Sequence, residues 1–177
     1  MTLPRVTVFL ALSLDGRLAG PGDDLTWLDR YAGDTPEATG YEALMASADT
    51  LLLGRRTYDT VLGFGAWPFA GHRVRVLTHR PVESRHGERA CAGELRCVLA
   101  ALGDEGAQHV YLDGGHAARQ GLEAGLVTDL WLHWVPEVLG DGPRLFDGTL
   151  TPSRWRLQTS RTLPSGLLQV HYMPSER

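Results

Sequence analysis

The sequence predicts a three-layer α/β/α domain whose central sheet is mostly parallel and ends in an antiparallel C-terminal hairpin. Two observations support this prediction. In the first two thirds of the chain, short apolar strands alternate with helices, as in proteins built from parallel β-α-β units. The last third is rich in strands and contains a tight turn. A length of 177 residues, 43% of them hydrophobic, suits a single domain over residues 1–177 with a full core.

The first strand is predicted at Val6–Leu14, where β-branched and apolar side chains occupy both faces. Such a pattern is typical of a central strand that helices cover on both sides. The strand ends at Asp15-Gly16, which is a turn signal. After a loop rich in Gly and Asp, apolar residues recur at helical spacing over Glu37–Ala48, which predicts a surface helix.

The middle of the chain contains two strand-glycine-helix units. The predicted elements here are strands at Thr50–Leu53, Arg73–Thr78 and His109–Leu112 and helices at Arg55–Leu62, Glu94–Gly103 and Ala117–Ala124. Gly54 ends the first strand of this region, and Gly125 stops its last helix. The loop Pro81–Gly93 is polar and irregular, so no element is predicted there.

The C-terminal third supplies the antiparallel edge. Its predicted strands are Leu126–Val135, Trp155–Ser160 and Leu167–Tyr172. A Leu-Pro-Ser-Gly turn joins the last two and predicts a hairpin. The segment Leu130–Val135 (LWLHWV) has two interpretations: it is buried within the sheet, or alternate residues are exposed and a homodimer covers them. We expect a homodimer.

Charge and composition exclude several classes of function. The 17 basic and 21 acidic residues give a net charge of −4, with no cationic face for nucleic acid and no basic block for a membrane. Cys91 and Cys97 form neither a disulfide framework nor the paired thiols of a zinc site, so no metal is expected. The N-terminus has neither the plan of a signal peptide nor a long apolar run. We therefore expect a cytoplasmic protein.

Three short motifs stand where predicted strands end. They are Gly54-Arg55-Arg56-Thr57, Thr78-His79-Arg80 and Asp113-Gly114-Gly115-His116-Ala117. Unpaired N–H groups and the helix dipole attract phosphate at such positions, an arginine neutralises its charge, and paired glycines let a backbone come close. Taken alone, the first motif is equally well a helix start with two solvated arginines, the second is a weak signal, and the third is better explained as a tight turn. Because all three lie at strand ends, one extended dinucleotide would touch all of them.

The type of dinucleotide follows from what the motifs lack. The sequence has no G-x-G-x-x-G, and no acidic residue stands where a Rossmann unit would bind a ribose. An ordinary Rossmann dehydrogenase is therefore disfavoured. An arginine-rich adenosine side favours the 2′-phosphate of NADP over NAD.

Taken in order, these segments resemble a known superfamily. Ser13–Ala19, Gly54–Tyr58, Leu77–Arg80 and Asp113–Gly115 resemble the cofactor-binding segments of dihydrofolate-reductase-like proteins. The stretches Glu123–Leu130 and Val135–Phe146 are similar to the C-terminal signature of the reductase domain of the bifunctional deaminase-reductase of riboflavin biosynthesis. The resemblance spans roughly residues 5–172. The C-x-x-C of the zinc deaminase is not present, so a stand-alone reductase is implied.

This resemblance implies a dihydrofolate-reductase-like fold with NADPH across the carboxyl edge of the sheet. Residues implied at the adenosine phosphates are Arg55, Thr57, Thr78 and Arg80, and those bordering the nicotinamide are Ala11, Leu12, Asp15, Gly16 and Leu18. Gly114 and Gly115 would approach the pyrophosphate, in this superfamily often through a cis Gly-Gly peptide. The neighbouring positions Gly54, Arg56, His79, Asp113, His116 and Ala117 complete the implied cofactor site.

The proton that accompanies hydride needs a donor, and Asp24 is the candidate. Asp24-Leu25-Thr26-Trp27 is similar to a folate-reductase segment in which an aspartate precedes Leu-x-Trp. A buried carboxylate there would orient a polar substrate and support protonation. Equally, Asp23 and Asp24 would only cap a short helix at Leu25–Tyr31.

Together these features predict an NADPH-dependent oxidoreductase that passes hydride to a C=N or C=O bond of a pteridine-like or ribosylamino-pyrimidine substrate. The resemblance points to 5-amino-6-(5-phosphoribosylamino)uracil reductase of riboflavin biosynthesis. Two alternatives stay open: dihydrofolate reduction, and a dimeric protein that binds NADP without turnover.

Overall fold

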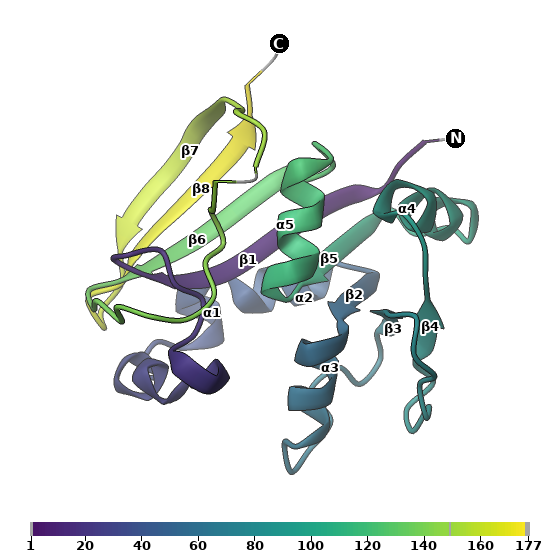
Figure 1. Ribbon diagram of the computed structural model, residues 1–177, viewed down its shortest axis with the longest axis horizontal. Coiled ribbons are helices and arrows are strands. Elements are labelled where there is room, and N and C mark those ends of the chain that lie inside the picture. The colour runs from purple at the N-terminus through teal and green to yellow at the C-terminus, as the bar shows by residue number, and fades with distance from the viewer. Residues whose placement is uncertain (1, 149, 176–177) are drawn as a thin grey trace.

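The computed structural model describes residues 2–148 and 150–175. Its strands form one eight-stranded sheet with the order β4-β3-β2-β5-β1-β6-β8-β7 (Figure 1). The strands are β1 (Arg5–Ser13), β2 (Thr50–Gly54), β3 (Arg73–Leu77), β4 (Arg89–Cys91), β5 (His109–Asp113), β6 (Asp129–Val135), β7 (Trp155–Thr162) and β8 (Leu168–Pro174). All pairs from β4 to β6 are parallel, whereas β8 pairs antiparallel with β6 and β7.

Helices cover both faces of the sheet. The α-helices are α1 (Pro36–Thr39), α2 (Tyr41–Ser47), α3 (Arg55–Leu62), α4 (Leu95–Asp104) and α5 (Gly115–Glu123), with 3-10 helices η1 (Pro21–Asp23) and η2 (Thr26–Tyr31) before them. In Figure 1, α5 stands in front of the sheet and α1 and α2 lie behind it. The three-layer fold with an antiparallel C-terminal hairpin is therefore confirmed.

Side-chain alternation along the strands separates two cores. Val8 and Leu12 of β1 pack with Leu99 of α4 and Ala118 of α5 on one face. On the other face, apolar residues of β2 and β3 pack with α2, α3 and the loop before β3; these are Leu44, Leu51, Leu53, Tyr58, Val61, Phe69, Val74 and Val76. Strand β1 lies inside the sheet because it pairs with both β5 and β6. Its apolar side chains on both faces agree with this position.

Three predicted elements differ from the structure. The helix expected over Glu37–Ala48 is divided into α1 and α2 at Gly40, whose φ of +76° is left-handed. The loop Pro81–Gly93, predicted to hold no element, contains the short edge strand β4. Finally, β6 begins at Asp129 and not at Leu126, because the two apolar residues at 126 and 127 turn into the core before pairing starts.

The strand segment LWLHWV is buried, in agreement with the first of its two interpretations. Leu130, Leu132, His133 and Val135 are buried, and the two tryptophans between them are half-buried. The exposed strand is instead β7, whose residues after Trp155 are all exposed.

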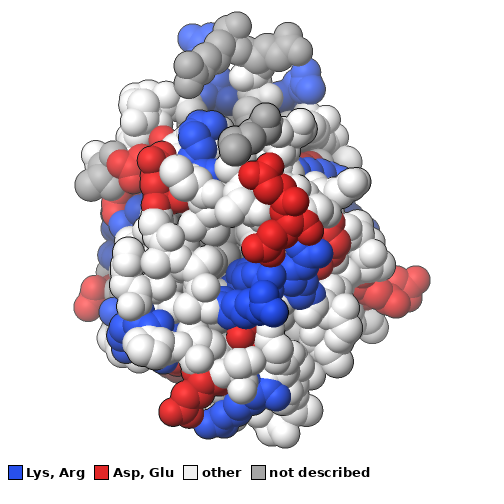
Figure 2. Space-filling view, turned by 90° about the vertical axis from the view of Figure 1, so that its right-hand side faces the viewer, with Lys and Arg blue, Asp and Glu red and all other residues white. Residues whose placement is uncertain are grey.

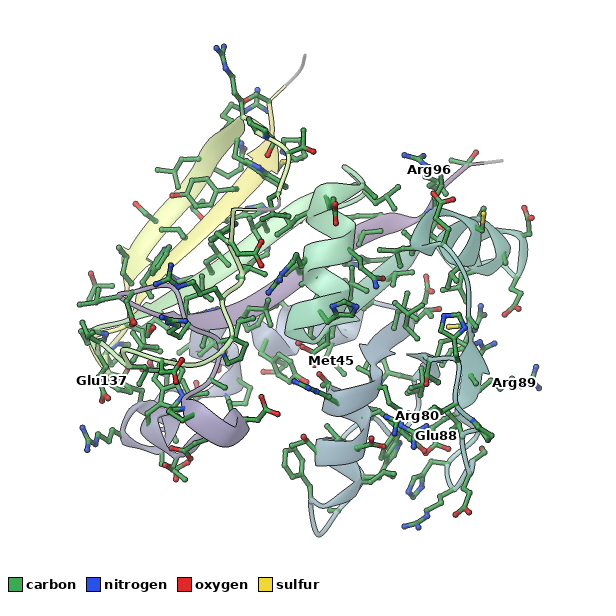
Figure 3. The ribbon with its side chains drawn as sticks, in the orientation of Figure 1. Met45, Arg80, Glu88, Arg89, Arg96 and Glu137 are labelled. Carbon is green, nitrogen blue, oxygen red and sulfur yellow. The ribbon has the colours of Figure 1, made fainter. Side chains whose placement is uncertain are left out.

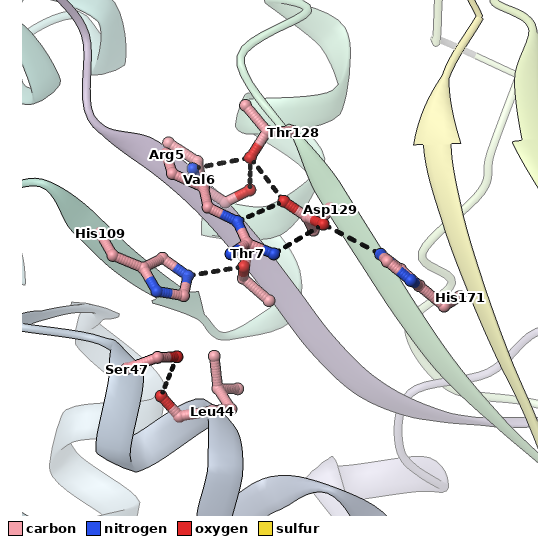
Figure 4. Close-up of polar contacts among 9 residues, drawn as sticks. All are labelled: Arg5, Val6, Thr7, Leu44, Ser47, His109, Thr128, Asp129 and His171. Atoms are coloured by element: carbon pink, nitrogen blue, oxygen red, sulfur yellow. Dashed lines mark hydrogen bonds and ion pairs between the residues drawn. The ribbon is translucent and has the colours of Figure 1, made fainter. Parts of the chain in front are cut away.

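A polar network ties the amino ends of the central strands together (Figure 4). The buried carboxylate of Asp129 accepts hydrogen bonds from Arg5 at 2.7 and 2.9 Å and lies 2.9 Å from Nε2 of His171. Nε2 of His109 lies 2.8 Å from the Thr7 hydroxyl. The predicted site segments that follow β1 and β5 at the carboxyl edge are thus built on strands whose amino ends are fixed. No helix in the described part of the chain is long and apolar enough to cross a membrane.

Candidate functional site

The carboxyl edge of the sheet brings three of the predicted segments into contact. A Cβ on Gly54 would lie 3.6 Å from Cβ of Ala117, and one on Gly114 would lie 2.5 Å from Oγ1 of Thr57. A Cβ on Gly115 would overlap Cδ1 of Leu18. The loop after β1, the start of α3 and the start of α5 therefore meet, with glycine at each close approach.

The two glycines differ in what they do to the backbone. Gly114 is the N-cap of α5 with φ +102° and ψ 136°, a conformation that favours glycine, whereas Gly115 is the first residue of the helix. Among the described residues no peptide bond is cis, so the expectation of a cis Gly-Gly peptide is wrong for this structure. The helix instead begins at Gly115 through the unusual φ of Gly114, and its first N–H groups remain available at the edge.

Arginines from two segments gather around one carboxylate that the sequence interpretation missed. Asp59, in the second turn of α3, accepts from Nε of Arg55 at 2.8 Å and lies 3.6 Å from Nη2 of Arg80. Arg55 also donates to the carbonyl of Pro81 at 2.8 Å. The two cations from the ends of β2 and β3 are thus held together with a net positive charge. The i, i+4 spacing of Arg55 and Asp59 is the signal that identifies this pair.

The other polar residues predicted on this side differ in their accessibility. Arg56 is exposed and lies 3.6 Å from Asp23 of η1. The buried Thr78 hydroxyl accepts from the backbone N–H of Arg80 at 3.0 Å, which fixes the turn after β3. His79 and His116 are exposed, and Nε2 of His116 lies 3.0 Å from Nε2 of Gln120.

Asp15 faces the loop after β6. Its carboxylate accepts from Ser13 at 2.7 Å and from the N–H groups of Leu139 and Gly140 at 3.0 and 2.9 Å. Hydrogen bonding from Ser13 and from these amides keeps the pKa of Asp15 below its usual range. Arg17 donates to the carbonyls of Gly140 and Gly142 at 2.8 and 2.5 Å. Together Asp15 and Arg17 fix the loop 139–142 against the turn after β1, which Gly16 makes with φ +76°.

The remaining predicted residues of β1 are packed. Leu12 is completely buried in the main core, so its side chain has no open face. Ala11 is half-buried and packs against a small cluster around Trp27 and Val135. Leu18 is half-buried where it meets α5.

Asp24 is exposed, contrary to the expectation of a buried carboxylate. It accepts from the backbone N–H and the hydroxyl of Thr26 at 3.0 and 3.1 Å. These hydrogen bonds lower the pKa of Asp24, so it is ionised at neutral pH. The geometry is that of a local turn in which Asp24 bonds two residues ahead, just before η2, whose N-cap is Leu25 and has no side-chain cap.

Among the described carboxyl groups, Asp113 at the end of β5 is the one whose pKa is raised. Burial raises the pKa of Asp113 to about 6, even though the N–H of Gly114 donates to it at 2.8 Å. Burial and the charge of Asp113 also raise the pKa of Tyr41 to about 12 and that of Tyr111 well above its usual value. The Tyr41 ring lies 6.3 Å from Tyr111 and 5.8 Å from Phe9. Asp113 therefore stands at the rim of an aromatic cluster, beside the glycine pair.

Glu88 organises the loop Pro81–Gly93, for which the sequence predicts no element. It is 2% exposed and accepts from the backbone N–H groups of Arg85 and His86 at 2.8 and 2.7 Å and from Ser84 at 3.1 Å. Burial raises its pKa, but these donors outweigh that effect and lower it. The Tyr58 hydroxyl of α3 lies 3.3 Å away, so the loop that carries Pro81 is anchored to the helix that carries Arg55.

Known proteins resemble this chain in sequence and in fold. The RibD C-terminal domain family matches residues 71–169. A crystal structure of a putative riboflavin biosynthesis protein from Shewanella sp. PV-4 is 30% identical, with a TM-score of 0.86 over 97% of this chain and 99% of that one. An uncharacterized protein of Bacillus subtilis, YwjB, is 25% identical over 172 residues, 96% of this chain and 97% of its own.

More distant structures share the fold alone. A dihydrofolate reductase from Enterococcus faecalis, complexed with NADP(H), has a TM-score of 0.67 at 16% identity over 97% of each chain. The deaminase/reductase of Thermotoga maritima has a TM-score of 0.73 at 15% identity, and this chain spans 57% of its length. No group of three or more metal-binding side chains occurs within residues 2–148 and 150–175.

Proposed function

The chain belongs to the RibD C-terminal domain family, a family of reductase domains, and we propose that it is an NADPH-dependent reductase acting on a C=N or C=O bond. Its substrate is a pteridine-like or ribosylamino-pyrimidine ring. The observation that supports this most is the meeting of Leu18, Thr57 and Gly114-Gly115 at one edge of the sheet. Two glycines stand where a Cβ would overlap Thr57 or Leu18, and backbone without side chains can come close to a pyrophosphate.

NADPH fits the residues on this edge. Arg55 and Arg80, joined by Asp59, would hold the adenosine phosphates together with Thr57 and Thr78. The N-termini of α3 and α5 add partial positive charge, with Gly114 and Gly115 closest to the pyrophosphate. When bound, the cofactor supplies the hydride. Ala11, Gly16 and Leu18 border the nicotinamide side, and Asp15 acts there through the loop that it holds.

We assign the proton to Asp113. Its pKa of about 6 keeps part of the carboxyl protonated near neutral pH, as a general acid requires. The Phe9 and Tyr41 rings offer a planar substrate an aromatic surface next to that carboxyl group. Asp24 stays a proposed residue of the substrate side, but as an exposed, ionised group it accepts hydrogen bonds and does not supply the proton.

We further propose a cytoplasmic homodimer of single-domain chains. We place the dimer surface on the hairpin formed by β7 and β8, and no longer on β6. Leu157 of β7 and Leu168 of β8 are 51% and 43% exposed. Light scattering of the purified protein tests this proposal, and a monomer at micromolar concentration contradicts it.

The function is tested by titrating NADPH and then NADH, with energy transfer from tryptophan to the nicotinamide as the signal. We expect saturable NADPH binding, much weaker NADH binding and weaker binding of both by Arg55→Ala. Arg154→Ala, an exposed arginine just before β7, is the matched control for loss of one positive charge. If neither nucleotide binds to the wild-type protein, the reductase proposal fails.

A substrate screen then separates the candidates. NADPH oxidation with a ribosylamino-pyrimidine supports the riboflavin-type reductase, whereas oxidation with dihydrofolate supports the alternative suggested by the Asp24 segment. Binding of NADPH without turnover of any pterin or pyrimidine supports the non-catalytic alternative.

A further inference from the structure

A cavity lies at the β4 edge of the sheet, away from Gly114 and Gly115. It has a volume of about 270 Å³ and is bounded by β3, β4 and α4. Its walls combine apolar side chains of α4, among them Val98 and Leu102, with the guanidinium groups of Arg75 and Arg89. A cavity of this size accepts a small molecule and is too small for a dinucleotide.

The charges around this cavity do not balance. Arg75 and Arg89 are paired in the register of β3 and β4, so two cations stand side by side on one face of the sheet. Arg73 lies on the same face, two residues before Arg75. The carboxylate at the cavity is Glu105, which accepts from Arg75 at 2.8 Å, while Arg73 donates to its carbonyl at 3.3 Å. Two arginines in the cavity wall thus share the Glu105 carboxylate, and Arg73 beside them bonds to the backbone carbonyl of Glu105.

The figures show how the basic side chains lie at this edge. In Figure 2, basic side chains gather in the middle of the face that contains this edge, with acidic side chains directly beside them. Figure 3 shows the Arg89 side chain extending away from β4. Among the described residues, Arg89 has no hydrogen-bond or ion-pair partner, whereas Arg75 is 9% exposed and fixed by Glu105. The Arg75 guanidinium is therefore held in place in the cavity wall, whereas the Arg89 guanidinium is free to close over a ligand.

We propose that this cavity binds a small organic anion, with a phosphate or carboxylate group opposite Arg75 and Arg89 and an apolar portion against α4. Such an anion supplies the negative charge that the paired strands lack. Guanidinium groups bind both carboxylate and phosphate through parallel N–H donors, so the site recognises the shared anionic chemistry. Phosphate monoester and carboxylate sources are distinguished by experiment.

Two cysteines on the cavity wall provide a direct readout. Cys97 is exposed, whereas Cys91 is half-buried and burial raises its pKa to about 11, so Cys97 reacts first with a disulfide reagent. The neutral reagent dithiodipyridine labels Cys97 by thiol-disulfide exchange, which forms a mixed disulfide and releases one equivalent of thiopyridone. A ligand in the cavity slows this labelling, and Cys97→Ser identifies the signal. The measurement does not depend on reductase activity.

The probes are phenyl phosphate, benzoate and neutral benzyl alcohol. We expect saturable protection of Cys97 by one or both anions and none by benzyl alcohol, and the ratio of the two anion affinities identifies the preferred head group. Arg89→Ala should weaken protection about tenfold, equivalent to about 1.4 kcal/mol, whereas Arg154→Ala should not change it. Arg75→Met removes the second cation and should abolish protection.

Three results would overturn the proposal. Equal protection by benzyl alcohol would show a purely apolar cavity. Protection that is unchanged in Arg89→Ala would show that the anion binds elsewhere. Protection by NADPH in competition with phenyl phosphate would show that the cavity belongs to the cofactor site.

Discussion

Oγ1 of Thr57 lies 2.5 Å from the point that a Cβ atom on Gly114 would occupy, so the start of α5 approaches α3 more closely than any other residue would allow. Gly114 also has a φ of +102°, which L side chains rarely adopt. We predict that Gly114→Ala destabilises the fold by about 2–3 kcal/mol through overlap and backbone strain, measured by urea unfolding. NADPH binding should weaken as well, because Thr57 has to move.

Gly33 provides the matched control for this substitution. Its φ is ordinary and no atom lies within 4 Å of an added Cβ. Gly33→Ala should therefore change the free energy of unfolding by less than about 0.5 kcal/mol. Equal effects of the two substitutions would contradict the close approach at Gly114.

Asp113→Asn tests the proton donor. Asparagine keeps the shape and the acceptor for the Gly114 N–H but has no proton to give. We expect kcat to fall by about 10²-fold or more with little change in NADPH affinity. In the wild-type protein kcat should decline as pH rises through about 6, the pKa of Asp113, and the variant should lose that dependence. A wild-type pH profile in the variant would assign the proton to another group.

The raised pKa of Asp113 also predicts how the free energy of unfolding depends on pH. Its pKa is raised from 3.8 to about 6 in the folded state, so the folded protein binds the proton more tightly than the unfolded chain. Protonated Asp113 makes its full contribution to the free energy of unfolding below pH 3.8, and this contribution is lost as the pH rises through about 6. Relative to Asp113→Asn, the wild-type protein should lose about 3 kcal/mol between these pH values, measured by urea unfolding at each pH. A constant difference between the two proteins would disprove the raised pKa.

Asp24→Asn distinguishes the two interpretations of Asp24. Asparagine retains the acceptor for the Thr26 N–H, so the local hydrogen bond before η2 survives the substitution. If Asp24 only makes this local hydrogen bond, kcat and KM should stay within about twofold of wild type, as the exposed position leads us to expect. A fall in kcat of about 10²-fold, with normal stability, would instead make Asp24 the acid.

Asp15→Ala tests the loop 139–142. The substitution removes the acceptor for the Leu139 and Gly140 N–H groups, so hydrogen exchange at these two amides should accelerate and the Tm should fall. The pKa of Asp15 is lowered by folding, so its contribution is present above the unfolded value of 3.8 and disappears as pH falls toward the folded value. Exposed Asp141→Ala in the same loop is the control. Unchanged exchange at residues 139 and 140 would refute the role of Asp15.

Glu88→Ala tests the anchor of the loop that carries Pro81. Ser84, Arg85, His86 and the buried Tyr58 lose their acceptor, so we expect a destabilisation on the order of 2–3 kcal/mol by urea unfolding. NADPH affinity should fall too, because Arg55 is held by the Pro81 carbonyl. Because folding lowers the pKa of Glu88, its carboxylate stabilises the fold at pH values above 4.5, the pKa in the unfolded chain. This stabilisation is lost on acidification. Exposed Glu83→Ala is the control, and equal behaviour of the two variants would count against the anchor.

The sequence by itself determined every strand except β4, most helices and the fold class of this protein, since these depend on periodicity, glycine stops and apolar residues on both faces of β1. The helix Arg55–Leu62 was predicted with the same bounds as the structure shows. The segments of the candidate site were also predictable, because they stand at strand ends and the strands are parallel. Their roles as binding residues remain predictions.

Only the tertiary structure decided what each side chain at that edge contacts. The raised pKa of Asp113 comes from burial by residues distant in sequence, and no local pattern reports it. Asp15 hydrogen-bonds to a loop 124 residues later, and Glu88 orders its own loop only because Tyr58 and that loop enclose it. Local sequence specifies backbone preference and which faces are apolar, whereas desolvation and long-range partners exist only once the chain has packed.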